Sequence, residues 1–270
     1  MKSGIIDFHT HAFPDSLAER AMRTLEQEGG IKAYLDGRIS SLISSMDRYG
    51  IEKSVVCSVA TKASQFDSIL AWSEEISSER IIPFPSFHPS DPKGLERISQ
   101  IKAKGFKGIK LHPYYQNFNV DDESLFPLYE KMCNENLILV LHTGFDFAFP
   151  FVRKADPEKI LKVKETFPSL KLVTTHLGGW KMWEEVEKFL VGKEIYMEIS
   201  FSLDFLDQET AKRIIMRHPE NFILFGTDSP WTDQGQTLSL LKKLKLGKRY
   251  EDLILRENAI ALLKDVFPQK

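Results

Sequence analysis

Residues 4–13 read GIIDFHTHAF, and this stretch contains the first predicted strand and the first two candidate metal ligands. Its first half, Gly4–Phe8, is an apolar run that predicts a buried strand. Its second half places His9 and His11 two residues apart, where a strand points both side chains to one face. Two imidazoles so placed can bind one metal ion at about 2.0–2.1 Å each. The alternative is that they pack or face solvent, because one motif match is only a hypothesis.

Seven further runs rich in Ile, Val, Leu and Phe follow along the chain, separated by amphipathic segments of helical length. Runs that are apolar on both faces are typical of parallel strands buried on both sides. The runs are Lys53–Val59, Ile81–Phe87, Phe106–Leu111, Leu137–Leu141, Leu170–Thr175, Glu194–Ser200 and Phe222–Gly226. The expected helices are Ser40–Tyr49, Gln65–Ser78, Asp91–Lys104, Glu123–Glu135, Asp156–Phe167, Gly179–Leu190, Asp207–Arg217, Gln234–Leu244 and Tyr250–Val266.

Eight alternations of strand and helix predict an α/β fold, a single (β/α)8 TIM barrel. A doubly wound sheet would normally carry a glycine-rich phosphate motif after its first strand, where this chain has histidines. We therefore expect one barrel domain over residues 1–270. Residues 14–38 are expected to form a loop over the mouth of the barrel, either a lid or a plain surface loop.

The composition of the chain argues against a disordered, a nucleic-acid-binding or a membrane protein. The 270 residues are 42% hydrophobic and 27% charged, which is ordinary for a globular protein and excludes disorder. A formal charge of −2 argues against a nucleic-acid partner. Cys57 and Cys133 cannot form a disulfide framework, and neither ends a predicted strand. With no signal peptide and no membrane-length apolar stretch visible, we expect a cytoplasmic protein without a membrane partner.

Most histidines fall where predicted strands end. Six of the seven do so, and in a barrel those ends converge on the mouth where active sites lie. They are His9, His11, His88, His112, His142 and His176. Asp228 follows the last strand in FILFGTDSPW and is expected at the same mouth, unless it only caps a helix. Imidazole with carboxylate suits Zn²⁺, and also Mn²⁺ or Fe²⁺. His218, near a helix end, is expected on the surface.

Five motifs follow one another along the chain: IIDFHTHAF, GFKGIKLHP, LILVLHTG, THLGG and FGTDSPW. Together they resemble the amidohydrolase superfamily of metal-dependent barrels. The match is closest to the amidohydrolase-related branch that includes aminocarboxymuconate-semialdehyde decarboxylase-like enzymes. The closing ENAIALL is similar to that branch as well, so the resemblance covers essentially the whole chain. These motifs do not specify a substrate.

The resemblance implies a ligand set and roles. One metal ion would be held by His9, His11, His142 and Asp228, with His176 beside it. Asp228 would accept a proton from the attacking water, and His176 would polarise the substrate. Two-metal members of the superfamily can carry a carboxylated lysine on the fourth strand. In that form Lys110 would bridge the ions, and His142 and His176 would bind the second one. Otherwise the Lys110 ammonium pairs with Asp228 or binds a substrate carboxylate.

The resemblance implies a hydrolase that cleaves a C–N or C–O bond of a small molecule with metal-activated water. The alternatives are a metal-dependent decarboxylase, a metal-independent lactonase and, more remotely, a catalytically silent binding barrel. Aromatic residues crowd the predicted mouth loops and suggest an aromatic or carboxylated substrate, unless they pack loops or form a dimer face. The candidate substrate-binding residues are His112, Lys110, Arg153, Trp231 and Tyr114. Asp7 is expected to orient a metal ligand by a hydrogen bond without binding the metal itself.

Overall fold

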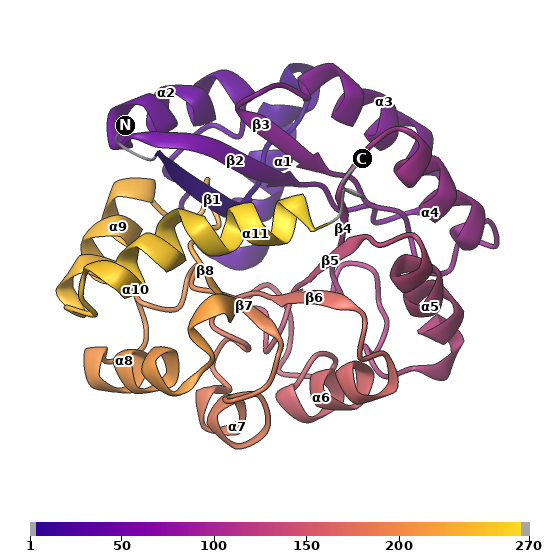
Figure 1. Cartoon of the computed structure of the whole chain (residues 1–270). Helices are drawn as coiled ribbons and strands as arrows, with labels where there is room; N and C mark the ends of the chain where they lie inside the picture. Colours follow the sequence, from indigo (N-terminus) through magenta and orange to yellow (C-terminus); the bar gives the residue numbers. More distant parts are fainter. Residues whose placement is uncertain (1–3, 266–270) are drawn as a thin grey trace.

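The computed structural model describes residues 4–265, in which eight parallel strands form the inner wall of a barrel (Figure 1). Each neighbouring pair is parallel within two hydrogen-bonded groups, β1-β2-β3 and β4-β5-β6-β7-β8. The strands are β1 (Ile5–Thr10), β2 (Ile51–Cys57), β3 (Ile81–Phe84), β4 (Gly108–Leu111), β5 (Ile138–Leu141), β6 (Lys171–Thr174), β7 (Tyr196–Glu198) and β8 (Ile223–Leu224).

Backbone hydrogen bonds outside the two ladders connect the two groups of strands. The Lys110 amide donates to the Pro85 carbonyl at 3.0 Å, which joins β4 to the end of β3. The Phe8 amide donates to the Phe225 carbonyl at 2.8 Å and joins β1 to β8. The expected (β/α)8 barrel is therefore confirmed. β7 lacks the first two and the last two residues of its predicted run, and Phe222 belongs to a 3₁₀ turn (Glu220–Phe222) that precedes β8.

Helices surround the strands, as the amphipathic pattern predicted (Figure 1). The helices α2 to α9 start within four residues of the expected positions. The helices are α1 (Asp15–Gly29), α2 (Ile39–Tyr49), α3 (Phe66–Ile76), α4 (Gly94–Ala103), α5 (Phe126–Asn134), α6 (Pro157–Thr166), α7 (Trp183–Phe189), α8 (Gln208–Arg217), α9 (Gln234–Lys243), α10 (Lys248–Asp252) and α11 (Asn258–Lys264).

The prediction of a loop across residues 14–38 was wrong, because α1 occupies most of that segment. Ala18 and Met22, four residues apart, are buried and attach one face of the helix to the barrel. Gly30 adopts a left-handed conformation with φ of 61° and ends the helix. Gly29 and Gly30 thus lie at the end of a helix rather than in a loop.

The C-terminal helical segment closes the end of the barrel that faces the viewer in Figure 1. It runs from Lys248 to Lys264 through a π-helical turn at Leu253–Glu257, two residues earlier than predicted at its start, while the predicted end at Val266 lies outside the described residues. Ala259, Leu262 and Leu263 pack into the apolar barrel interior. No helix within residues 4–265 is long and apolar enough to cross a bilayer.

Candidate metal centre and cavity

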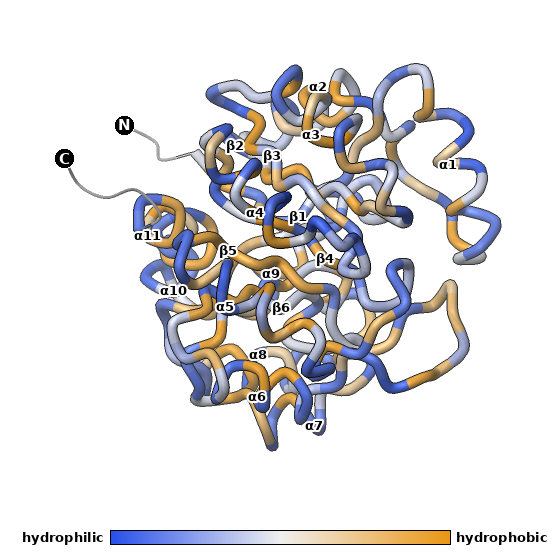
Figure 2. Tube along the Cα trace, turned by 90° about the vertical axis from the view of Figure 1, so that its right-hand side faces the viewer, coloured by the Kyte–Doolittle hydropathy of each residue, from blue (hydrophilic) through white to orange (hydrophobic). Residues whose placement is uncertain are grey.

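A cavity of about 940 Å³ lies at the mouth of the barrel, where the C-terminal ends of the strands converge. Its lining includes His9, Lys110, His142, His176 and Asp228, which come from five different strand ends. α1 lies on this side of the molecule, whereas α11 covers the opposite side (Figure 2). The mouth is thus open to ligands while the other end is plugged by apolar side chains.

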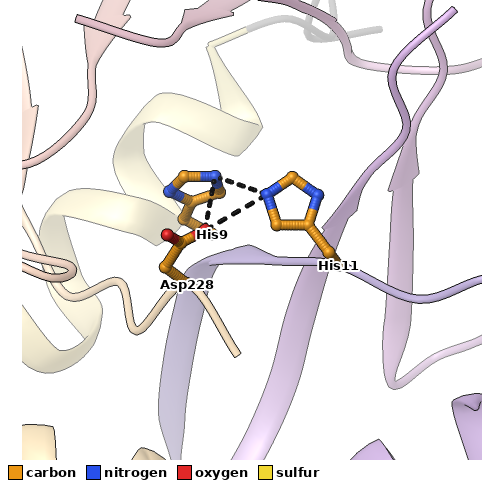
Figure 3. Close-up of side chains that lie close together, drawn as sticks. All are labelled: His9, His11 and Asp228. Atoms are coloured by element: carbon orange, nitrogen blue, oxygen red, sulfur yellow. Dashed lines mark hydrogen bonds and ion pairs between the residues drawn. The ribbon is translucent and has the colours of Figure 1, made fainter. Parts of the chain in front are cut away.

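Three donor atoms converge at the base of the cavity (Figure 3). The Nε2 atoms of His9 and His11 lie 3.0 Å apart. Asp228 Oδ1 lies 3.4 Å from His9 Nε2 and 3.2 Å from His11 Nε2. The histidines come from the end of β1 and Asp228 from just beyond β8, so the closure of the barrel brings them together.

The hydrogen bonds of the two imidazoles orient their free nitrogens toward this point. Nδ1 of His11 lies 2.7 Å from the Cys57 carbonyl, which only accepts, so in the neutral ring Nδ1 carries the proton and Nε2 has a free lone pair. Nδ1 of His9 donates to Glu198 Oε1 at 3.0 Å. Burial holds the pKa of His9 well below its usual range, which keeps the ring neutral.

These spacings fit a metal ion. Donors at about 2.0–2.1 Å from an ion lie about 3.3–3.4 Å apart in a tetrahedron and about 3.0 Å apart in an octahedron. The three observed separations fall in that range. Two unprotonated nitrogens and a carboxylate oxygen that face one another also repel unless a cation lies between them. The donor set therefore fits a divalent cation held by His9, His11 and Asp228.

Hydrogen bonds to residues of β1 hold the backbone around Asp228 in place. Asp228 has φ of 61°, an unusual value for a residue with a side chain, and its amide donates to the His9 carbonyl at 2.7 Å. Asp7 accepts from the Thr227 hydroxyl at 2.6 Å and from Gln234 Nε2 at 2.8 Å, and burial raises its pKa to about 7. Asp7 thus ties β8 to β1 rather than contacting a histidine ring.

Glu198, on β7, accepts a hydrogen bond from Nδ1 of His9, the ring nitrogen that does not face Asp228. This residue was not predicted from the sequence. It is fully buried and accepts from the Ser200 amide, the Ser200 hydroxyl and the His176 amide as well as from His9. Burial raises its pKa to about 8, and the hydrogen bonds from Ser200 and His176 oppose that rise. A glutamate near the end of the otherwise apolar run YMEIS was the available signal.

Lys110 is fully buried on β4, with Nζ 3.2 Å from His9 Nε2. Burial lowers the pKa of its ammonium. Within the described residues it forms no ion pair with Asp228, one of the two arrangements expected for a charged lysine. Its position beside a proposed metal ligand is compatible with either a substrate contact or a bridging carbamate.

The structure does not bring His142 into the group of His9, His11 and Asp228. Its Nδ1 instead lies 3.2 Å from His176 Nε2, and its Nε2 donates to the Phe145 carbonyl at 3.1 Å. His176 Nδ1 donates to the Ser200 carbonyl at 3.1 Å. Both facing nitrogens are therefore unprotonated in the neutral rings. A neutral His176 cannot donate from Nε2, so the expected polarisation of the substrate would require a charged ring that burial disfavours.

His112 stacks on His142 with ring centroids 4.1 Å apart. Asp146, a residue that the sequence did not single out, lies 3.4 Å from His112 Nε2 and 3.7 Å from His142 Nε2. These three buried residues form a second group whose ligand atoms are close enough to hold a cation. Asp146 lies in the loop after β5, between Phe145 and Phe147 of the run FDFAF.

Two of the other predicted substrate-binding residues line the cavity, and one does not. Tyr114 and Trp231 line the cavity, together with six more of the predicted mouth aromatics: Tyr115, Phe145, Phe147, Phe149, Trp180 and Phe201. Arg153 is not brought into the cavity, because its guanidinium pairs with Asp156 and Glu185.

Two expectations about individual residues were wrong. His218 is buried rather than on the surface, with Nε2 donating to the Ile195 carbonyl at 2.8 Å. Cys57 does end a strand, β2, and lines the cavity. Its carbonyl rather than its thiol contacts His11, and burial raises the pKa of the thiol to about 12, so it stays protonated.

Comparison with known proteins now identifies the family. The sequence profile of the amidohydrolase family matches residues 6–264. The chain belongs to the amidohydrolase family. It is thus an enzyme of the amidohydrolase superfamily, and the resemblance seen in the five motifs is confirmed.

Individual relatives are distant. A dihydroorotase from Helicobacter pylori (strain HPAG1) is 25% identical over an alignment of 237 positions that covers 74% of this chain and 68% of the relative. An uncharacterized TIM-barrel protein, Bb4693 from Bordetella bronchiseptica, superposes with a TM-score of 0.79 at 20% identity, over 97% of this chain and 99% of the other. A dihydroxybenzoic acid decarboxylase from Polaromonas sp. JS666, with bound manganese and the inhibitor 2-nitroresorcinol, gives a TM-score of 0.73 at 14% identity, over 97% of each chain. These structures share the fold.

Proposed function

We propose that this amidohydrolase uses a divalent metal to hydrolyse a C–N or C–O bond of a small molecule. The convergence of His9 Nε2, His11 Nε2 and Asp228 Oδ1 at the base of the cavity carries the proposal. A divalent cation, when bound there, supplies polarisation of the scissile group and a water whose pKa falls toward about 7. Neutral imidazoles with one carboxylate favour Zn²⁺, with Mn²⁺ or Fe²⁺ as alternatives.

The chain's own residues supply the remaining steps. Asp228 lies only 6% exposed at the cavity floor, so its second oxygen can take a proton from the attacking water and return it to the leaving group. Glu198 holds the His9 ring in place through Nδ1. Aromatic walls exclude water from the bound substrate and suit a planar or unsaturated molecule.

A second ion is the first variant of this proposal. The unprotonated nitrogens of His142 and His176, 3.2 Å apart, favour it, because a cation between them would remove their repulsion. In that form Lys110, as a carbamate, would bridge the two positions. Metal analysis of fully loaded protein tests it: two equivalents per chain are expected for this variant, and one equivalent for the single-ion form.

Decarboxylation on the same scaffold is the second candidate. The shared fold with the manganese-bound dihydroxybenzoic acid decarboxylase and the aromatic cavity favour it. A panel of aromatic esters, lactones, amides and hydroxybenzoates, scored for both bond cleavage and carbon dioxide release, separates the two reactions. Our proposal predicts cleavage that disappears with a chelator and returns with Zn²⁺. Carbon dioxide release without cleavage would favour the decarboxylase, and activity that survives complete metal removal would contradict both.

A further inference from the structure

One face of α1 forms part of the cavity wall. The residues of this face recur every three or four positions, as they must on one side of a helix. They are Leu17, Arg20, Ala21, Thr24, Leu25 and Glu28. Ala18 and Met22 attach the helix to the barrel, and Phe147 of the loop after β5 lies against Gly29 at its end. The helix therefore stands over the mouth as a fixed wall.

Arg20 is the single arginine of this wall within the part of the chain that the structure describes. It makes no hydrogen bond or ion pair with any residue in 4–265. Arg23, one turn further along, pairs with Glu19 at 2.8 Å and does not line the cavity. Arg153, which the sequence predicted to bind the substrate, instead forms ion pairs with Asp156 and Glu185.

The charges around the cavity set what Arg20 can bind. Lys110 is the only other lysine or arginine of the described lining, and it lies fully buried against His9 at the floor. His9 and Asp228 at the floor are buried, whereas Arg20 on the α1 wall is exposed, and aromatic rings line the same cavity. An unpaired guanidinium beside an apolar space favours a carboxylate or other planar anion, with which it forms two parallel hydrogen bonds.

We propose that Arg20 anchors an anionic group of the substrate at the α1 wall, away from the group that reacts at the cavity floor. This inference rests on the proposed function, because it places the reacting end at His9, His11 and Asp228. It defines the substrate class as a small aromatic molecule with a carboxylate remote from the scissile bond. α1 thereby becomes the element that selects the substrate.

Matched ligands test the assignment. Terephthalate and isophthalate are compared with 4- and 3-carbamoylbenzoate, which have the same shape and one charge fewer, by titration calorimetry on zinc-loaded full-length protein. We expect at least one dicarboxylate to bind the wild type about tenfold more tightly than its monoamide. Arg20→Met should bring that preference to within about twofold, Arg20→Lys should keep part of it, and Arg23→Met should leave it unchanged.

The result that would overturn the proposal is a preference that survives in Arg20→Met, or no preference in the wild type for either pair. Thermal unfolding of each variant excludes loss of fold as the cause, and the exposed position of Arg20 makes such a loss unexpected. Because calorimetry needs no turnover, failure of the hydrolysis assay leaves this result intact. Conversely, an active hydrolase without the charge preference would overturn the anchor alone.

Discussion

Gly144 is the position where a single methyl group should separate the two loops that carry His142 and His176. It has φ of 81° and forms a parallel bridge with Trp180. A Cβ atom on Gly144 would lie 2.1 Å from the Trp180 nitrogen, 2.5 Å from the Gly179 carbonyl carbon and 2.6 Å from the Trp180 oxygen. All three are backbone atoms, so the clash cannot be relieved by a rotamer change.

The cost of Gly144→Ala has two parts. The left-handed conformation alone costs a residue with a side chain about 1 kcal/mol. Separation of the loops also breaks the bonds from the Phe145 amide to the Trp180 carbonyl and from the Trp180 amide to the Thr143 carbonyl, and strains the bond from the Gly144 amide to the Ala155 carbonyl. At about 1 kcal/mol each, these bring the expected loss of unfolding free energy to about 4 kcal/mol.

Gly192→Ala is the matched control, because Gly192 has φ of 86° but nothing within 4 Å of an added Cβ. For a chain of this length, about 4 kcal/mol lowers the melting temperature by about 10 °C, and about 1 kcal/mol lowers it by about 3 °C. Differential scanning calorimetry of the three proteins measures both shifts. A Gly144→Ala protein no less stable than Gly192→Ala would refute the claim that this contact holds the His142 and His176 loops together.

Two further changes test the buried polar groups. Burial lowers the pKa of His218 to about 4, so the unfolded chain binds one more proton between that value and its ordinary 6.5. The stability from the neutral ring is complete above pH 6.5 and falls by about 3 kcal/mol as the pH drops toward 4. Urea unfolding should show a weaker loss in His218→Gln, and equal losses would contradict this. Glu198→Gln should weaken zinc binding about tenfold to a hundredfold in a chelator competition, whereas the exposed Glu194→Gln should not; equal affinities would remove Glu198 from the site.

The sequence was sufficient for the barrel because buried parallel strands are apolar on both faces and leave a plain pattern. It was also sufficient to place His9, His11 and Asp228 near one another, since the C-terminal ends of barrel strands converge. It could not place α1, which lies in the segment that was expected to be a loop. That difference matters for function, because the helix, not a loop, forms the cavity wall that carries Arg20.

The remaining parts of the site depend on contacts between distant segments. Glu198 is a single polar residue in an apolar run, and only the approach of β7 to β1 brings it to His9. Arg153 follows a run of mouth aromatics, yet its charge is satisfied by Glu185 on the neighbouring helix. No local pattern distinguishes an arginine that pairs with a glutamate of another helix from one that faces a cavity.

The measurement that tests the central claim most directly is the anomalous difference map of a zinc- or manganese-loaded crystal. We expect the strongest peak at about 2.0–2.2 Å from His9 Nε2, His11 Nε2 and Asp228 Oδ1. A second, weaker peak between His142 and His176 would support the two-ion form. A peak held by His112, His142 and Asp146, with none between His9 and His11, would contradict the account.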